Sequence, residues 1–78
     1  MKFPKIKSIK IISKNYIIIV LFDNGITKNI DFSEKLKEDF YSDLKNKLLF
    51  EQAKIDEGGY GISWNDDIDI SEYELWSM

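Results

Sequence analysis

The chain has 78 residues, a net charge of −3 and no histidine, cysteine or arginine, so all eleven of its positive charges are lysines. These absences remove the most common general base, the strongest nucleophile, the soft metal ligands and the side chain that binds phosphate in a bidentate way. A chain of this length has room for one core, so we expect a single domain over residues 1–78. Its composition suits a binding domain better than an enzyme.

Positive and negative charges are concentrated at opposite ends of the chain. The first fourteen residues contain no acid and five lysines: Lys2, Lys5, Lys7, Lys10 and Lys14. Residues 56–78 contain no base and seven acids: Asp56, Glu57, Asp66, Asp67, Asp69, Glu72 and Glu74. The acidic end and the overall negative charge argue against nucleic acid as a partner.

The sequence contains no recognisable membrane or export segment. The longest apolar run, residues 16–22, has the length of a strand, whereas a membrane span needs roughly 20 apolar residues. The N-terminal lysines are not followed by the apolar region and cleavage site of a signal peptide. We therefore expect a cytoplasmic protein that has no contact with a membrane.

Three strands are predicted in the first part of the chain. Residues 5–13 form the first, and their lysines suit an edge strand, where charge discourages association between sheets. The uninterrupted apolar run 16–22 is typical of a central strand that is covered on both faces. Asp23-Asn24-Gly25 has the composition of a tight turn. The strand that follows, residues 26–31, has Ile26, Ile30 and Phe32 on one side and Thr27, Asn29 and Asp31 on the other.

One helix is predicted after these strands. Four apolar side chains recur at intervals of four residues: Leu36, Phe40, Leu44 and Leu48. Such a stripe is typical of a helix that covers a sheet, although it could also form a groove for a partner. Ser33 or Asp39 is expected to cap this helix, and Leu49 and Phe50 to end it in the core.

A second, shorter hairpin and a helical turn are predicted for the rest of the chain. Residues 53–56 and 60–64 form the hairpin around a turn at Glu57-Gly58-Gly59. Ser71 and Glu74 have the spacing of a capping box, which begins the C-terminal helical turn. The fold class is therefore α+β, with an antiparallel three-stranded meander, one helix, a second short hairpin and a C-terminal helical turn.

Large aromatic rings lie among the acids of the C-terminal quarter. Tryptophan and tyrosine often anchor interfaces, and the surrounding acids would complement a basic partner. The alternative is that these rings belong to the core. The predicted partner-binding residues are Tyr60, Trp64, Asp67, Asp69, Tyr73 and Trp76.

The one candidate for a metal or carboxylate site is a cluster of three acids, Asp66, Asp67 and Asp69. Their spacing does not match a calcium-binding loop, so we expect no metal, no cofactor and no catalytic residue. Two other functions stay open. One is a small carboxylate or metal-dependent enzyme that uses these acids. The other is a structural homodimer, which would pair through the first strand or through the uncovered face of the sheet.

A series of short motifs resembles a known family in order and spacing. They are Phe22-Asp23-Asn24-Gly25, Asp31-Phe32, Leu44, Leu49-Phe50, Ile62-Ser63-Trp64, Asp69-Ile70 and Tyr73-Glu74-Leu75. Over nearly the whole chain they resemble the small bacterial domain-of-unknown-function family DUF2442. The resemblance implies a compact α+β domain, found alone or joined to a helix-turn-helix segment, and sometimes encoded beside another small protein as the antitoxin of a toxin–antitoxin pair.

The resemblance supplies no catalytic residue. No helix-turn-helix segment follows Leu75-Trp76 in this sequence, so we do not expect DNA-binding autoregulation. We expect a non-enzymatic protein-binding module, in its most concrete form an antitoxin-like subunit that neutralises a small partner protein.

Overall fold

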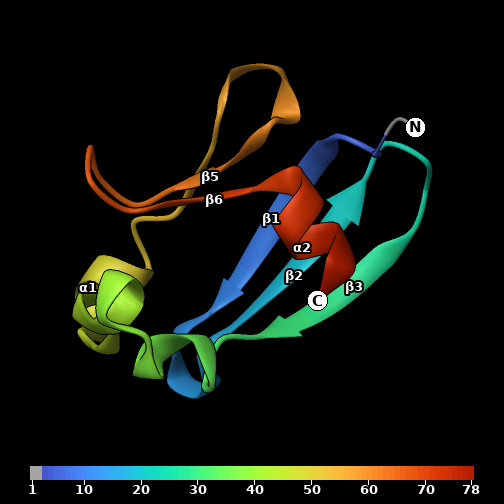
Figure 1. Cartoon of the computed structure of the whole chain (residues 1–78). Coiled ribbons are helices and arrows are strands. Elements are labelled where there is room, and N and C mark those ends of the chain that lie inside the picture. The colour runs from blue at the N-terminus through green and yellow to red at the C-terminus, as the bar shows by residue number, and fades with distance from the viewer. Residues whose placement is uncertain (1–2) are drawn as a thin grey trace.

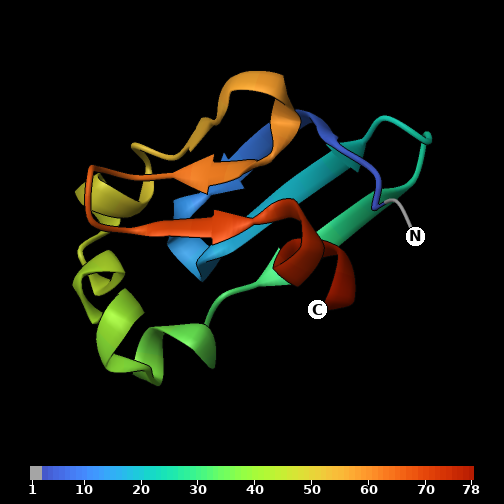
Figure 2. The ribbon, with the colours of Figure 1, turned by 45° about the horizontal axis from the view of Figure 1, so that its top comes forward.

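The computed structural model describes residues 3–78, so Lys2 of the basic N-terminus lies outside the described residues. Two antiparallel sheets and several short helices enclose one hydrophobic core (Figures 1 and 2). The strands are β1 (Ile6–Ile12), β2 (Ile17–Phe22), β3 (Thr27–Asp31), β4 (Lys54–Ile55), β5 (Gly61–Ser63) and β6 (Asp69–Ser71). The α-helices are α1 (Lys47–Phe50) and α2 (Glu72–Ser77). The α+β class is confirmed.

The first sheet has the predicted meander, with strand order β1-β2-β3 and antiparallel neighbours. The lysine-bearing strand β1 lies at an edge and β2 lies at the centre, as predicted. Burial alternates along β2, where Ile18, Val20 and Phe22 are buried and Ile17, Ile19 and Leu21 are half-buried. The prediction that both faces of β2 are covered is therefore wrong. The rest of the chain packs only against the face that carries Ile18, Val20 and Phe22.

The turn between β2 and β3 follows from its three residues. Gly25 has a φ of +87°, which a residue with a side chain rarely adopts. Its amide donates to the carbonyl of Phe22 (3.0 Å). The side-chain oxygen of Asn24 accepts from the amide of Ile26 (3.0 Å). A three-residue loop with glycine in the left-handed region is a common hairpin connection, so this prediction is confirmed.

The predicted single helix is wrong. The segment forms three short helical pieces: η2 (Lys35–Lys37), η3 (Asp39–Lys45) and α1. The backbone returns to extended conformations at Glu38 and Asn46, and each break turns the following side chains to a new direction. Leu36 and Leu44 are therefore buried, whereas Phe40 and Leu48 are exposed by 52% and 74%.

The caps of this segment also differ from the prediction. Neither Ser33 nor Asp39 caps a helix, since η2 and η3 begin without a side-chain cap. Asn46 caps α1 instead, because its side-chain oxygen accepts from the amide of Leu48 (3.0 Å). The predicted end is correct, with Phe50 buried and Leu49 packed against the core.

The second sheet has strand order β4-β5-β6. The hairpin of β4 and β5 was predicted, whereas β6 was not, because acids dominate the sequence around it. The cap of α2 is confirmed, since the hydroxyl of Ser71 accepts from the amide of Glu74 (3.1 Å). The carboxylate of Glu74 does not complete a capping box but contacts the Lys35 ammonium.

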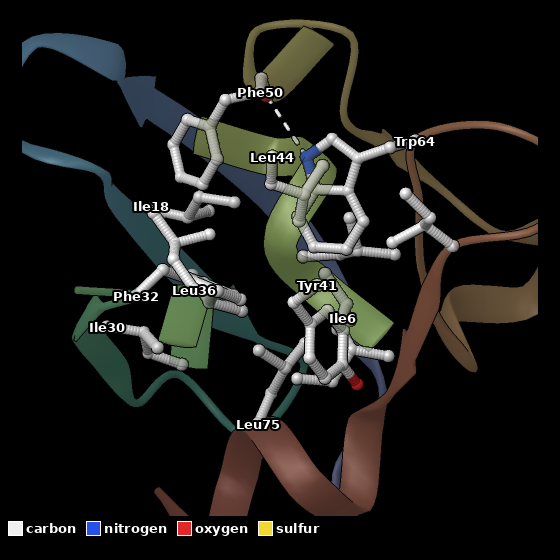
Figure 3. Close-up of a cluster of buried hydrophobic side chains, with 14 of the residues drawn as sticks. Ile6, Ile18, Ile30, Phe32, Leu36, Tyr41, Leu44, Phe50, Trp64 and Leu75 are labelled. Atoms are coloured by element: carbon white, nitrogen blue, oxygen red, sulfur yellow. Dashed lines mark hydrogen bonds between the residues drawn. The ribbon is translucent and has the colours of Figure 1, made fainter. Parts of the chain in front are cut away.

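The core lies between the first sheet, the second sheet and the helices (Figure 3). At its centre the rings of Phe32, Phe50 and Trp64 meet, two of the three pairs edge to face with centroids 5.7 Å apart. The indole nitrogen of Trp64 donates to the backbone carbonyl of Phe50 (3.0 Å). None of the helices in residues 3–78 has the length and apolar content needed to cross a bilayer.

Candidate partner-binding surface

Of the two tryptophans of the predicted site, one is buried in the core and the other is half-buried and packs against it. Trp64 is only 5% exposed, and its indole is bonded to Phe50, so we correct its assignment from interface anchor to core residue. Trp76 is half-buried and packs edge to face on Phe22, with ring centroids 5.0 Å apart. Lys28 covers it further, because the Lys28 ammonium donates to the Trp76 carbonyl and lies 5.5 Å from the ring centroid.

The two tyrosines, in contrast, project into solvent. Tyr60 is 60% exposed and Tyr73 is 52% exposed. The amide of Glu72 donates to the carbonyl of Tyr60 (2.9 Å), which ties the start of α2 to the residue before β5. The ring of Phe3 packs on that of Tyr73, with centroids 4.4 Å apart. Both tyrosines are thus held at one end of the β5–β6 hairpin.

Lys5 joins these rings into one surface. Its ammonium lies 4.6 Å from the centroid of the Tyr60 ring and 3.4 Å from the carboxylate of Glu72. Beside it is an open hollow of about 530 Å³, lined by Phe3, Pro4, Lys5, Asp23, Asn24 and Tyr60. We call Phe3, Lys5, Tyr60, Glu72 and Tyr73 the tyrosine end.

The predicted acids Asp67 and Asp69 lie away from the tyrosine end, at the other end of the same hairpin. The side-chain oxygen of Asn65 accepts from the amides of Asp67 and Ile68 (both 2.9 Å), which shapes the turn. We call residues 65–69 the acidic turn. A second hollow, of about 360 Å³, is lined by Lys54, Ser63, Trp64, Asn65, Asp66 and Asp69. Within residues 3–78, no three acidic side chains are grouped closely enough to hold a metal ion.

The segregation of charge along the sequence is partly cancelled by folding. Two of the C-terminal acids pair with lysines of the first half, Glu72 with Lys5 and Glu74 with Lys35. The bond to Glu74 raises the pKa of Lys35 above its ordinary value. The remaining exposed acids, including those of the acidic turn, leave the C-terminal quarter with excess negative charge.

The six predicted residues therefore do not form one surface. Tyr60 and Tyr73 lie at the tyrosine end and Asp67 and Asp69 in the acidic turn, while Trp64 lies in the core and Trp76 packs against it. Sequence reasoning missed Phe3 and Lys5, because local pattern cannot link the start of the chain to its last quarter. The one available signal was the concentration of lysines at one end of the sequence and acids at the other.

A family model described as "Protein of unknown function (DUF2442)" matches residues 6–77. The chain belongs to this family. The match covers nearly all of it, which confirms the resemblance inferred from the motifs. Comparison with curated proteins and with solved structures found no match.

Proposed function

We propose that the chain is a non-enzymatic, cytoplasmic protein-binding module with an antitoxin-like role, in which it neutralises a small partner protein. The observation that carries this proposal is the pair of exposed rings, Tyr60 and Tyr73, fixed by backbone and ring contacts at the tyrosine end. Tyrosine offers a large apolar face and a hydroxyl, and rigid aromatic side chains lose little entropy when a partner covers them.

The charges around these rings favour a basic partner. Lys5 is already engaged by Glu72, whereas Asp23 lines the same hollow without a basic partner among the described residues. Complementary charge would speed association and orient the partner. The antitoxin-like version rests on the resemblance to DUF2442 proteins, which are sometimes encoded beside another small protein as the antitoxin of a pair.

Co-expression with the product of the adjacent reading frame tests the proposal. We expect the neighbour alone to inhibit growth, and co-expression of this chain to restore growth and to co-purify the neighbour. A neighbour that is harmless alone, or that never co-purifies, would contradict the antitoxin-like role.

A double variant locates the binding surface. Tyr60→Ala/Tyr73→Ala should lose rescue and co-purification while keeping the melting temperature of the wild type, because both rings are largely exposed. Phe40→Ala is the matched control, since Phe40 and Tyr73 are both 52% exposed. Equal effects of the two variants would show that the tyrosine end is not the binding surface.

The second candidate function is a carboxylate or metal-dependent enzyme at the acidic turn. Its one supporting observation is the hollow lined by Asp66 and Asp69. Lys54 lines the same hollow, and its ammonium would repel a cation. Calorimetric titration with Mg²⁺, Ca²⁺ and Mn²⁺ separates the two functions, because heat abolished by Asp66→Asn/Asp69→Asn would favour the enzyme.

A further inference from the structure

The first sheet has an outer face that the rest of the chain leaves uncovered. Cross-strand pairing places three rows of side chains on it: Ser8, Leu21 and Thr27; Lys10, Ile19 and Asn29; Ile12, Ile17 and Asp31. The apolar members of this outer face are half-buried and do not pack against the core, unlike Ile9 and Ile11 on the other face of β1. In Figures 1 and 2 the second sheet and α2 lie on the opposite side of the first sheet. Nothing in residues 3–78 covers this apolar strip.

The outer face carries opposite charges at its two edges. Lys10 lies on β1 and Asp31 lies on β3, one row apart, and both are exposed. Among the described residues neither forms an ion pair. The carboxylate of Asp31 accepts from the amide of Ser33 (2.8 Å), which orients it. Hydrogen bonds from Ser33 also lower the pKa of Asp31, so this carboxylate is ionised at neutral pH.

We propose that the outer face binds a second copy of this chain, in a two-fold dimer whose axis runs parallel to the strands. Rotation about such an axis lays β1 of one copy over β3 of the other, so each Lys10 faces the Asp31 of the other copy. An axis across the strands would lay β1 over β1 and bring the two Lys10 ammonium groups together. The pairing of Lys10 with Asp31 therefore favours a second copy of this chain as the partner, with the two-fold axis parallel to the strands.

The spacing of packed sheets permits these ion pairs. Two sheets pack about 10 Å apart and neighbouring rows on one face are about 7 Å apart, which puts the two Cα atoms about 12 Å apart. An extended lysine and an aspartate together bridge that distance. Three strands and three rows give a footprint on the order of 300 Å², below the roughly 800 Å² per partner of standard complexes. We therefore expect a weak, reversible dimer with a Kd on the order of 100 μM.

Sedimentation velocity on the full chain, from about 10 μM to about 1 mM, tests the dimer. The wild type should shift from monomer to dimer across this range. Ile19→Lys, at the centre of the strip, should weaken association at least roughly tenfold. Its thermal unfolding should change little, because Ile19 does not contact the core. Phe40→Lys, at an exposed apolar position on η3, is the control and should leave the dimer intact.

Charge variants test the orientation. Lys10→Glu should weaken the dimer, and Lys10→Glu/Asp31→Lys should restore it, whereas Lys45→Glu makes the same charge change elsewhere and should have no effect. If Asp31→Lys unfolds the chain by losing its bond to Ser33, the dimer of the wild type should still weaken with added salt, and that of Lys10→Glu should not. A monomer at every concentration, a dimer indifferent to Ile19→Lys, or one strengthened by Lys10→Glu would overturn the proposal.

Discussion

The two faces of strand β2 both consist of apolar residues but differ in burial. On the inner face Ile18, Val20 and Phe22 have no exposed surface, whereas on the outer face Ile17, Ile19 and Leu21 stay half-buried. The difference comes from the cover, by which we mean the second sheet and the helical segments that pack on the inner face only. Because free energy follows the apolar area removed from water, stability should depend on the inner face and leave the outer face free for association.

Alanine substitutions at two adjacent positions of β2 should give the largest difference in stability between its two faces. Phe22→Ala removes a fully buried ring and should lower the free energy of unfolding by about 3–5 kcal/mol. Leu21→Ala, one residue earlier on the outer face, should lower it by about 1 kcal/mol. Urea unfolding monitored by circular dichroism measures both. If Phe22→Ala does not fold, Phe22→Leu should still cost more than Leu21→Ala, and equal losses would contradict the asymmetry.

Much of the first sheet could be predicted because its signals are local. Asp23-Asn24-Gly25 fixes the turn, and the alternation after it separates Ile30 from Asn29 and Asp31. The asymmetry of β2 itself was hidden, since all of residues 17–22 are apolar. It could have been found from the partner strand, because polar Asn29 and Asp31 lie opposite Ile19 and Ile17.

The helical segment and the site could not be predicted in the same way. The spacing of Phe40 and Leu48 fits one helix, but the breaks at Glu38 and Asn46 depend on how the segment packs against the core. Trp64 and Tyr60 are both large aromatic residues near β5. Trp64 is buried because its ring packs on Phe32 and Phe50 and its indole donates to the Phe50 carbonyl, whereas Tyr60 stays exposed. These contacts join residues that are distant in sequence, so local pattern does not reveal them.

Two glycine substitutions should distinguish a glycine that packs against the first sheet from one that only forms a turn. Gly59 has a φ of +76°, and a Cβ there would lie 2.4 Å from the carbonyl oxygen of Ile6, where the turn before β5 meets β1. Gly59→Ala should therefore cost about 2–4 kcal/mol, from backbone strain and overpacking together. Gly25→Ala is the control, because its φ of +87° is equally strained but no atom lies within 4 Å of the added Cβ.

Gly25→Ala should cost only about 1 kcal/mol. Thermal unfolding of the two variants gives the comparison directly. A Gly25→Ala loss as large as that of Gly59→Ala would mean that the backbone angle, and not the contact between cover and sheet, dominates at both positions.

Removing one hydrogen bond should sharpen the distinction between core and surface aromatic residues. Trp64→Phe keeps an aromatic ring but leaves the buried carbonyl of Phe50 without its donor, so we expect a loss of about 1–3 kcal/mol. Trp76→Phe, at a half-buried position, should cost less than about 1 kcal/mol. Guanidinium unfolding measures the loss of stability in both variants. A larger loss for Trp76→Phe would show that Trp76 on α2, and not Trp64, contributes more to the packing against the first sheet.

The smallest effect should come from the ion pair that holds α2 to η2. Lys35 pairs with Glu74 at the surface, a contact worth about 0.2–1 kcal/mol. Because this bond raises the pKa of Lys35 above 10.5, its contribution is fully present below that pH and is lost as the pH rises through the folded value. Lys35→Met should therefore reduce stability at neutral pH and flatten its alkaline decline.

The titration of Tyr41 must be eliminated before the effect of Lys35 can be measured. Burial raises the pKa of its hydroxyl, so the protein also loses stability at alkaline pH when this hydroxyl ionises. Comparing Tyr41→Phe with Tyr41→Phe/Lys35→Met leaves the lysine as the variable group, and the difference between them should shrink as Lys35 deprotonates. A difference that stays constant as the pH rises well above 10.5 would show that Lys35 contributes through the packing of its methylene groups and not through its charge.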